Sequence, residues 1–252
     1  MRIIISPAKK MNRDLETLEY RQLPQFLVQA QQILEILASM SREQLKELWK
    51  CNDQITNLNY ERIQEMTKNM DALTPAVLAY EGIQYQYMAP AVFERSAYEY
   101  VEEHLRILSG FYGILRPFDG VVPYRLEMQA RLSVNGSRNL YDFWGNRIAR
   151  QLCSETDCIV NLASKEYSKC VEKYLKEDFA KDIRFVTCVF GELCPDGRVR
   201  EKGTYAKMAR GEMVRFMAET RVEKPEQLKE FARLGYQFCE TSSTKNKYVF
   251  II

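Results

Sequence analysis

The chain has 252 residues, of which 46% are hydrophobic and 28% charged. This is the balance of a globular protein, at a length that suits one large or two small domains. No stretch reaches the roughly 20 apolar residues of a membrane-spanning helix, and the apolar start at 1–7 is too short for a signal peptide. Because no linker, repeat or low-complexity tract divides the sequence, we expect one cytoplasmic domain over residues 1–252, with no membrane partner.

Cysteine usage argues against metal chemistry. The seven cysteines form no C-x-x-C pair, and His104 is the one histidine that could join them. Zinc and iron–sulfur sites need closely spaced Cys and His ligands. We therefore expect reduced thiols, mostly buried, with no stable metal site and no cofactor, and iron sequestration by the cysteines is disfavoured for the same reason.

The formal net charge of +2 hides an uneven distribution. Residues 24–103 contain 6 Lys and Arg against 12 Asp and Glu, a net charge of −6, and the remaining residues contain 30 against 22, a net charge of +8. Such asymmetry favours a surface for nucleic acid or another polyanion, built from the N-terminus and the C-terminal half. Scattered, solvated charge is the alternative.

The first part of the chain starts with a strand and continues mainly in helices. Residues 2–6 are a β-branched run that ends at Pro7, which predicts a buried strand followed by a loop. The apolar periodicity of 24–80 is helical, with a capping box that starts at Ser41 and a further helix that starts at Thr74-Pro75.

A glycine-rich segment at 108–116 follows the helix that we expect after Glu94. Gly110 and Gly113 lie between apolar anchors, which resembles the helix-hairpin-helix motif, where glycine amides face a DNA phosphate. Arg116 would add a cation. A plain tight turn is the alternative, because that motif separates its glycines by one residue and this chain separates them by two.

Strands and helices are interleaved in the second half. The expected elements are a strand at 121–128, a helix at 140–152, a strand at 158–163 that leads into a helix at Ser164, strands at 184–193 and 199–205, helices at 205–220 and 225–234, and a closing hairpin of 236–238 with 248–251. This pattern predicts an α+β fold, a mixed sheet with surrounding helices.

Two strand ends carry groups that suit an anion. Ser6 and Lys9 follow the first strand, and Ser164 and Lys165 follow the strand at 158–163. The carboxyl ends of strands are where α/β sheets place ligands, and a helix N-terminus favours negative charge. The structural alternatives are a solvated first loop and simple helix capping by Ser164.

Two further motifs add cations. In P-Y-R-L-E-M, 123–128, alternation puts Arg125 and Glu127 on one face, either as a phosphate clamp with an acid/base group or as a structural ion pair. Lys207 and Arg210 share one face of a basic helix, either as phosphate contacts or as part of a solvated face.

Together these motifs resemble the YaaA-type peroxide stress resistance family, long catalogued as a domain of unknown function. The matching stretches, in the family's order, are I-S-P-A-K at 5–9, L-S-G-x-Y-G-x-L-R-P at 108–117, P-Y-R-L-E-M at 123–128, Y-x-F-W-G at 141–145, N-L-A-S-x-E-Y at 161–167 and Y-A-K-x-A-R-G-x-M-x-R-F at 205–216. The resemblance implies a cytoplasmic stress protein in which a helix-hairpin-helix-like element lies beside a positively charged cleft that binds DNA.

Two functional hypotheses follow. The first is a DNA-binding protein that contacts the phosphates of double-stranded DNA with little sequence preference. Its phosphate-binding candidates are Ser6, Lys9, Gly110, Gly113, Arg116, Arg125, Ser164, Lys165, Lys207 and Arg210. The second is an enzyme acting on a nucleotide or on a damaged or modified DNA base in the same cleft, with Lys9 as an amine nucleophile or Glu127 as the group that activates water.

Overall fold

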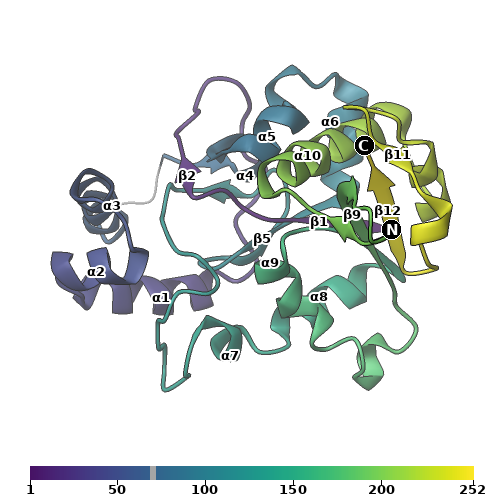
Figure 1. The fold of residues 1–252 in the computed structure, drawn as a ribbon. Helices are drawn as coiled ribbons and strands as arrows, with labels where there is room; N and C mark the ends of the chain where they lie inside the picture. Colours follow the sequence, from purple (N-terminus) through teal and green to yellow (C-terminus); the bar gives the residue numbers. More distant parts are fainter. Residues whose placement is uncertain (69–71) are drawn as a thin grey trace.

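A mixed β-sheet forms the centre of the computed structural model, which describes residues 1–68 and 72–252 (Figure 1). Its middle consists of five parallel strands, in the order β5 (Leu105–Ser109), β1 (Arg2–Ile5), β8 (Cys158–Leu162), β9 (Arg184–Leu193) and β12 (Lys247–Ile251). Antiparallel strands close both edges, β6 (Gly113–Leu115) beside β5 and β11 (Gln237–Phe238) beside β12. The predicted α+β fold with a mixed sheet is confirmed.

The central strand β1 shows why this sheet forms. Ile3, Ile4 and Ile5 are all fully buried, which a strand achieves only when both faces of its sheet are covered. Ile3 pairs with Leu105 on one side and with Val160 on the other. β-Branched side chains favour such extended, densely packed positions.

The order of the parallel strands matters for function. Numbered along the chain, they follow the order 2-1-3-4-5, which is one of the two common orders of doubly wound sheets. Ligands of such sheets bind outside the carboxyl ends of the strands, where the strand order reverses. In this chain that point lies between β1 and β8.

Helices cover both sides of the sheet (Figure 1). On one side lie α5 (Ile83–Met88), α6 (Arg95–His104) and α10 (Gly203–Thr220), and on the other lie α8 (Arg147–Glu155) and α9 (Lys165–Glu172), with α7 (Leu140–Trp144) close to them. None of the described helices has the length and apolarity needed to cross a bilayer.

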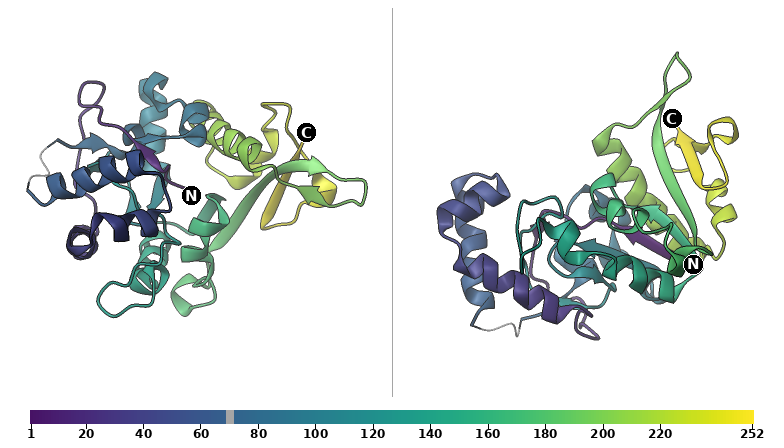
Figure 2. Two further views of the ribbon diagram at one scale, coloured as in Figure 1. Left: turned by 60° about the vertical axis from the view of Figure 1, so that its left-hand side comes forward. Right: turned by 90° about the horizontal axis from the view of Figure 1, so that it is seen from below.

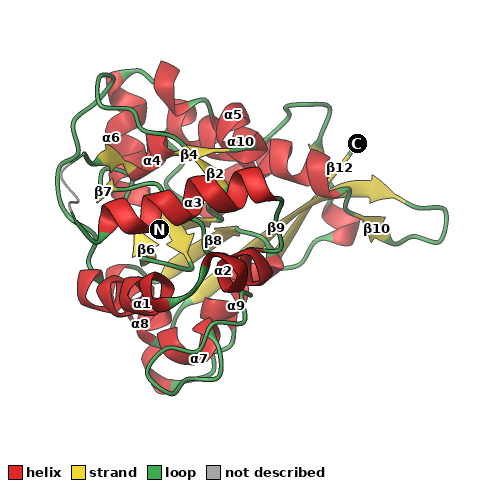
Figure 3. Ribbon diagram, turned by 90° about the vertical axis from the view of Figure 1, so that its left-hand side faces the viewer, coloured by secondary structure: helices red, strands yellow, loops and turns green. Residues whose placement is uncertain are grey.

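Three helices form a lobe beside the sheet (Figures 1 and 3). This helical lobe consists of α1 (Leu27–Ser39), α2 (Arg42–Trp49) and α3 (Asp53–Met66). The predicted capping box at Ser41 is present, and Asn52 caps α3. The lobe is attached to the sheet region by Arg62 of α3, which donates a hydrogen bond to the carbonyl of Met11 at 3.0 Å.

Short elements complete the fold. They are β2 (Lys10–Met11) paired with β4 (Tyr80–Glu81), β3 (Thr74–Pro75) paired with β7 (Gly120–Val121), the single turn α4 (Ala76–Ala79), β10 (Val199–Arg200) paired with the end of β9, and 3-10 helices at 90–92, 178–180, 225–230 and 240–242. The β9–β10 hairpin projects away from the body (Figure 2).

The predicted helix-hairpin-helix at 108–116 is wrong. The helix after Glu94 ends at His104, and residues 105–109 form β5, which turns into β6 as a β-hairpin. A short apolar run fits a helical stripe and a strand buried on both faces equally well. Here all five residues of β5 are buried, as in a strand whose two faces are both covered.

Other boundaries also differ from the predictions. The strand predicted at 121–128 is reduced to β7 (Gly120–Val121), and residues 122–128 form no strand. The predicted helix at 140–152 is divided at Gly145 into α7 and α8. The helix expected from Thr74-Pro75 is the single turn α4, and the one expected at 225–234 is a 3-10 helix at 225–230. The strand at 158–163 that leads into a helix at Ser164 and the closing hairpin are confirmed.

Candidate functional site

The ends of β1 and β8 are joined by two serines. The Ser6 hydroxyl accepts a hydrogen bond from the Ser164 backbone N–H at 2.8 Å and donates one to the Ser164 hydroxyl at 3.1 Å. Tyr85 donates to the Ser6 carbonyl at 2.9 Å. The structure therefore brings together the two strand ends that the sequence singled out, and the Ser6 hydroxyl finds its partners within the chain.

Glu127 is the centre of a cluster of charges at this edge of the sheet. Its carboxylate lies 2.8 Å from Lys9 Nζ and 3.5 Å from Arg125 Nη2. The side chain of Arg125 is only 11% exposed, and its buried Nε has no hydrogen-bond partner among the described residues. The predicted Arg125–Glu127 ion pair is present, with 3.5 Å between its nearest atoms, and Lys9 is the closer partner of Glu127.

Gly110 holds the segment that carries this cluster. A Cβ atom at Gly110 would lie 2.7 Å from the Leu126 carbonyl oxygen and 3.1 Å from the backbone of Glu127. The segment 126–128 therefore crosses directly over the end of β5. Gly110 is needed for this close backbone approach, which is a different role from the predicted phosphate contact.

Glu166 adds a second carboxyl group. Its Oε1 accepts a hydrogen bond from the Gln129 backbone N–H at 3.2 Å. Burial raises the pKa of Glu166, the Gln129 N–H lowers it, the charge of Glu127 raises it, and Lys9 lowers it, with a net rise above the usual value. Sequence reasoning missed this residue, because an acidic residue in the first turn of a helix is explained by the helix dipole alone.

A cleft of about 760 Å³ lies between α2 of the helical lobe and the segment 127–131. Lys9, Lys50 and Arg131 supply its positive charges, and Glu47 and Glu127 its negative ones. Sequence reasoning missed Lys50 and Arg131, since neither lies in a recognisable motif and the lobe has an acidic composition.

One wall of this cleft is aromatic. Trp49 of α2 lines the cleft and is 4% exposed, and its indole N–H has no hydrogen-bond partner among residues 1–68 and 72–252. Buried indole N–H groups usually find an acceptor. Trp49 thus adds an aromatic edge beside the charges of the cleft, and its indole N–H is buried in the wall.

The remaining predicted residues are distributed unevenly. Lys165 is exposed at the start of α9, next to Ser164, and Lys207 is exposed on α10. Arg210 is only 14% exposed and lies 3.1 Å from Glu201, so it does not share an open face with Lys207. A phosphate at Arg210 would have to compete with that carboxylate.

Arg116 lies away from the cleft. Because β6 runs antiparallel to β5, the end of β6 lies at the opposite edge of the sheet from Ser6 and Ser164. Arg116 is bound there to Asp119 at 2.9 Å and donates to the Leu23 carbonyl. The structure therefore does not bring Arg116 together with the other candidates. Gly113, at the start of β6, pairs with Ser109 beside Gly110 and does not line the cleft.

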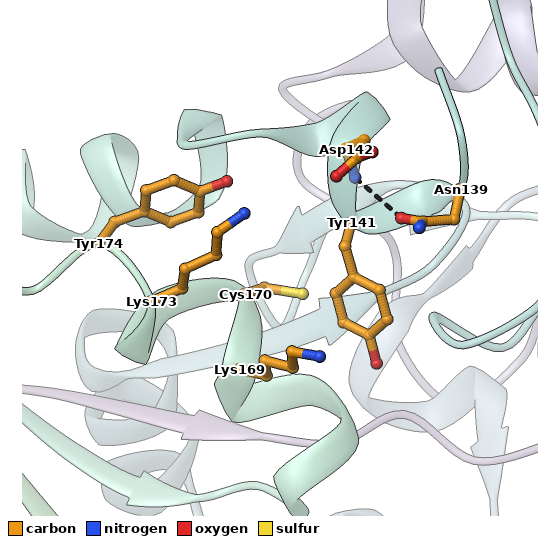
Figure 4. Close-up of a pocket in the computed structure, with 7 residues that line it drawn as sticks. All are labelled: Asn139, Tyr141, Asp142, Lys169, Cys170, Lys173 and Tyr174. Atoms are coloured by element: carbon orange, nitrogen blue, oxygen red, sulfur yellow. Dashed lines mark hydrogen bonds between the residues drawn. The ribbon is translucent and has the colours of Figure 1, made fainter.

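A smaller pocket of about 250 Å³ lies between α7 and α9 (Figure 4). Tyr141, Lys169, Lys173 and Tyr174 line it, together with Asn139, whose side chain accepts a hydrogen bond from the Asp142 N–H at 3.0 Å. Burial raises the pKa of the neighbouring Cys170 thiol to about 12, which keeps that thiol protonated.

The thiols and carboxylates do not gather into a metal cage within the described part of the chain, where no three His, Cys, Asp or Glu side chains form a metal-binding group. Cys158, Cys170 and Cys188 are buried, whereas Cys51, Cys153, Cys194 and Cys239 are partly exposed, so the expected burial holds for fewer than half of them.

Comparison with known proteins agrees with the resemblance seen in the sequence. The profile of a family described as peroxide stress protein YaaA matches residues 1–242. UPF0246 proteins from Desulfitobacterium hafniense and Lachnoclostridium phytofermentans are 57% and 54% identical to this chain, each over its full length and over 98% and 96% of their own. A UPF0246 protein from Agathobacter rectalis is 53% identical over 99% of the chain and 98% of its own length. The chain therefore belongs to the YaaA family of peroxide stress proteins.

Proposed function

We propose that this peroxide stress protein binds the phosphate backbone of double-stranded DNA in the cleft. The observation that carries the proposal is the unneutralised positive charge of the cleft. Lys50 and Arg131 line it without a carboxylate within 4 Å among the described residues, whereas most arginines of this chain are paired. A polyanion supplies the missing negative charge.

The position of the cleft supports the same proposal. Its lining includes Lys9, which follows β1, and Gln129, which donates a hydrogen bond to Glu166 in the helix that follows β8. The strand order reverses between β1 and β8, and Lys165 adds another exposed cation there. Contacts from ammonium and guanidinium groups to phosphates carry no base information. We therefore expect binding that tolerates any DNA sequence and that weakens steeply with salt. We expect it to take place in the cytoplasm, where bacterial DNA lies.

A fluorescence anisotropy titration with two duplexes of unrelated sequence, at 50 and 200 mM salt, tests this proposal. The variant Lys50→Gln/Arg131→Gln should lower the slope of log affinity against log salt by about 1.8, at roughly 0.9 per lost phosphate contact. The control Lys245→Gln/Lys247→Gln neutralises two exposed lysines near the start of β12, at the opposite edge of the sheet.

Two outcomes would contradict the proposal. Absence of binding at 50 mM salt would exclude a DNA-binding role. An equal change of slope in the control variant would place the contact elsewhere than in the cleft.

A second candidate function is catalysis on a DNA base or nucleotide, and the Glu127–Glu166 pair favours it. Glu127 is paired with Lys9 and Arg125, whereas burial raises the pKa of Glu166. Two carboxyl groups with unlike environments are the usual arrangement for acid/base hydrolysis of a glycosidic bond. Lys9 suits the amine-nucleophile role less, because a nucleophile needs a free lone pair and Lys9 is held in an ion pair.

A panel of duplexes, each with one damaged or modified base, tests the catalytic candidate. Release of a base by the wild type, and its loss in Glu127→Gln with DNA affinity retained, is the expected result. If no duplex of the panel yields a product, the cleft serves binding alone.

A further inference from the structure

A row of three lysines runs along α9. Lys165, Lys169 and Lys173 are spaced four residues apart, which places them on one face of the helix, and all three are exposed. Within the described part of the chain, none of them has a carboxylate within 4 Å. Neighbouring like charges at this spacing destabilise a helix slightly, so the row has an electrostatic cost that a bound anion would remove.

The acidic residues of α9 do not neutralise this row. Glu166 faces the backbone of Gln129, and the Glu172 carboxylate lies 3.5 Å from the amide of Asn161. Both carboxyl groups are therefore engaged elsewhere.

Two of the lysines line the pocket between α7 and α9. Figure 4 shows the ammonium groups of Lys169 and Lys173 pointing into this space beside two tyrosine rings. Lys169 Nζ lies 4.9 Å from the centre of the Tyr141 ring, and Lys173 Nζ lies 5.2 Å from that of Tyr174. Such contacts orient an ammonium group without cancelling its charge.

Asp142 is the acidic residue among those that line the pocket, and its carboxylate already has a cationic partner. Asp142 pairs with Arg138 at 2.6 Å, outside the lysine row. The pocket therefore presents two ammonium groups to whatever enters it.

The lysine row begins where the cleft ends. Glu166 at the start of α9 contacts Gln129, which lines the cleft, and the Tyr141 hydroxyl donates to the Glu166 carbonyl at 3.0 Å. Lys173 follows Lys165 by eight positions along α9, which is an axial rise of about 12 Å. That distance matches the axial rise of roughly three to four phosphates along one DNA strand.

We propose that the α9 lysine row extends the DNA-binding surface beyond the cleft, and that the pocket between α7 and α9 takes a backbone phosphate of the strand that leaves the cleft. This inference rests on the proposed DNA-binding function. The shared chemistry is a phosphate group, and continuity with the cleft favours a phosphodiester of a bound strand over a free nucleotide.

The variant Lys169→Gln/Lys173→Gln tests the inference by anisotropy, with Lys245→Gln/Lys247→Gln as the matched control. Loss of two phosphate contacts lowers the salt slope by about 1.8 on duplex DNA and about 1.4 on a single strand. The affinity ratio of wild type to variant should therefore shrink by about 12-fold between 50 and 200 mM salt on duplex DNA, and by about 7-fold on a single strand. The control should keep the wild-type slope.

The outcomes separate this inference from the function on which it rests. If the wild type binds no DNA, the proposed function fails and the inference with it. If the wild type binds and Lys169→Gln/Lys173→Gln keeps its slope, with the Lys50→Gln/Arg131→Gln variant losing slope, only the inference is overturned. Adenosine monophosphate, tested by calorimetry, gives the third outcome. If the wild type binds it, and Lys169→Gln/Lys173→Gln loses this binding but keeps its salt slope on DNA, the pocket binds a free nucleotide and the inference that a DNA strand enters it is overturned.

Discussion

At Gly110, the end of β5 lies against the backbone of 126–128. An added Cβ would lie 2.7 Å from the Leu126 carbonyl oxygen, and backbone atoms cannot yield as a flexible side chain does. We expect Gly110→Ala to lower the free energy of unfolding by about 1–3 kcal/mol, the usual cost of overpacking a dense interior. Urea unfolding measures this.

Gly203→Ala is the matched control for Gly110. A Cβ at Gly203 meets open space at the start of α10, where alanine favours the helix more than glycine does. This variant should unfold at the wild-type urea concentration or above it. If both variants lose stability equally, the close approach at Gly110 is not the cause.

The raised pKa of Glu166 predicts a pH-dependent stability difference. The folded protein holds the Glu166 proton more tightly than the unfolded chain, so the contribution of this group to stability is full below the usual value of 4.5 and is lost as pH rises through the folded pKa. Glu166→Gln removes this titration and keeps an oxygen acceptor for the Gln129 N–H. Relative to wild type, the variant should therefore become more stable between pH 4 and pH 7.

Urea midpoints of both proteins at these two pH values test the prediction for Glu166. The difference between the two proteins cancels the other titrating groups. A difference that is constant with pH would show that Glu166 titrates as it does in the unfolded chain.

The residues of the site were predictable only in part. Ser6 and Ser164 were found because each follows a buried strand, a pattern that is local in the sequence. Lys50, Arg131 and Glu166 were not. Lys50 and Arg131 meet only because α2 lies across the cleft from the segment 127–131, and Glu166 of α9 joins the site only through its hydrogen bond with Gln129. No local pattern reports such packing.

At the scale of elements, the hydrogen bonds that link the end of β1 to the start of α9 depend more on the Ser6 hydroxyl than on the Ser164 hydroxyl. Ser6→Ala removes both hydrogen bonds and leaves the Ser164 N–H without its acceptor, at a cost of about 1–3 kcal/mol. Ser164→Ala removes only the hydroxyl–hydroxyl bond, since the Ser164 side chain does not cap α9. We expect Ser6→Ala to be the more destabilising variant in urea unfolding.

The reverse order for the two serine variants would contradict this asymmetry. It would indicate that the Ser164 hydroxyl supports the start of α9 in a way that the two hydrogen bonds at Ser6 do not explain.

The elements divide into those that local patterns determine and those that the sheet determines. The strand at 158–162 and the capping box at Ser41 were predicted from residues that touch within a few positions. β5 was mistaken for helix, because its apolar residues continue the stripe of α6 and only pairing with β1 and β6 makes them a strand. The order of the parallel strands likewise depends on contacts between residues far apart in the sequence.

At the scale of the whole molecule, the uneven charge has a structural counterpart. The acidic stretch 24–103 includes the entire helical lobe (Figures 1 and 3). Helix α2 of this lobe forms one wall of the cleft, opposite the segment 127–131. The cleft is therefore not uniformly basic. Its lobe wall carries Lys50 together with Glu47, which faces the space that the proposal gives to DNA.

Glu47 should accordingly weaken DNA binding in the wild type. Glu47 is exposed and has no cation within 4 Å among residues 1–68 and 72–252, so its charge is opposed only by solvent. One exposed charge at contact distance contributes about 0.5–1 kcal/mol in a water-like medium.

We expect Glu47→Gln to bind duplex DNA about two- to fivefold more tightly at 50 mM salt, with the gain fading at 200 mM as salt screens the repulsion. Glu35→Gln, which removes an exposed charge of α1 that does not line the cleft, should gain less in the same anisotropy titration. Equal gains in both variants would mean that net charge alone sets the affinity, and no gain in Glu47→Gln would mean that DNA does not pass along α2.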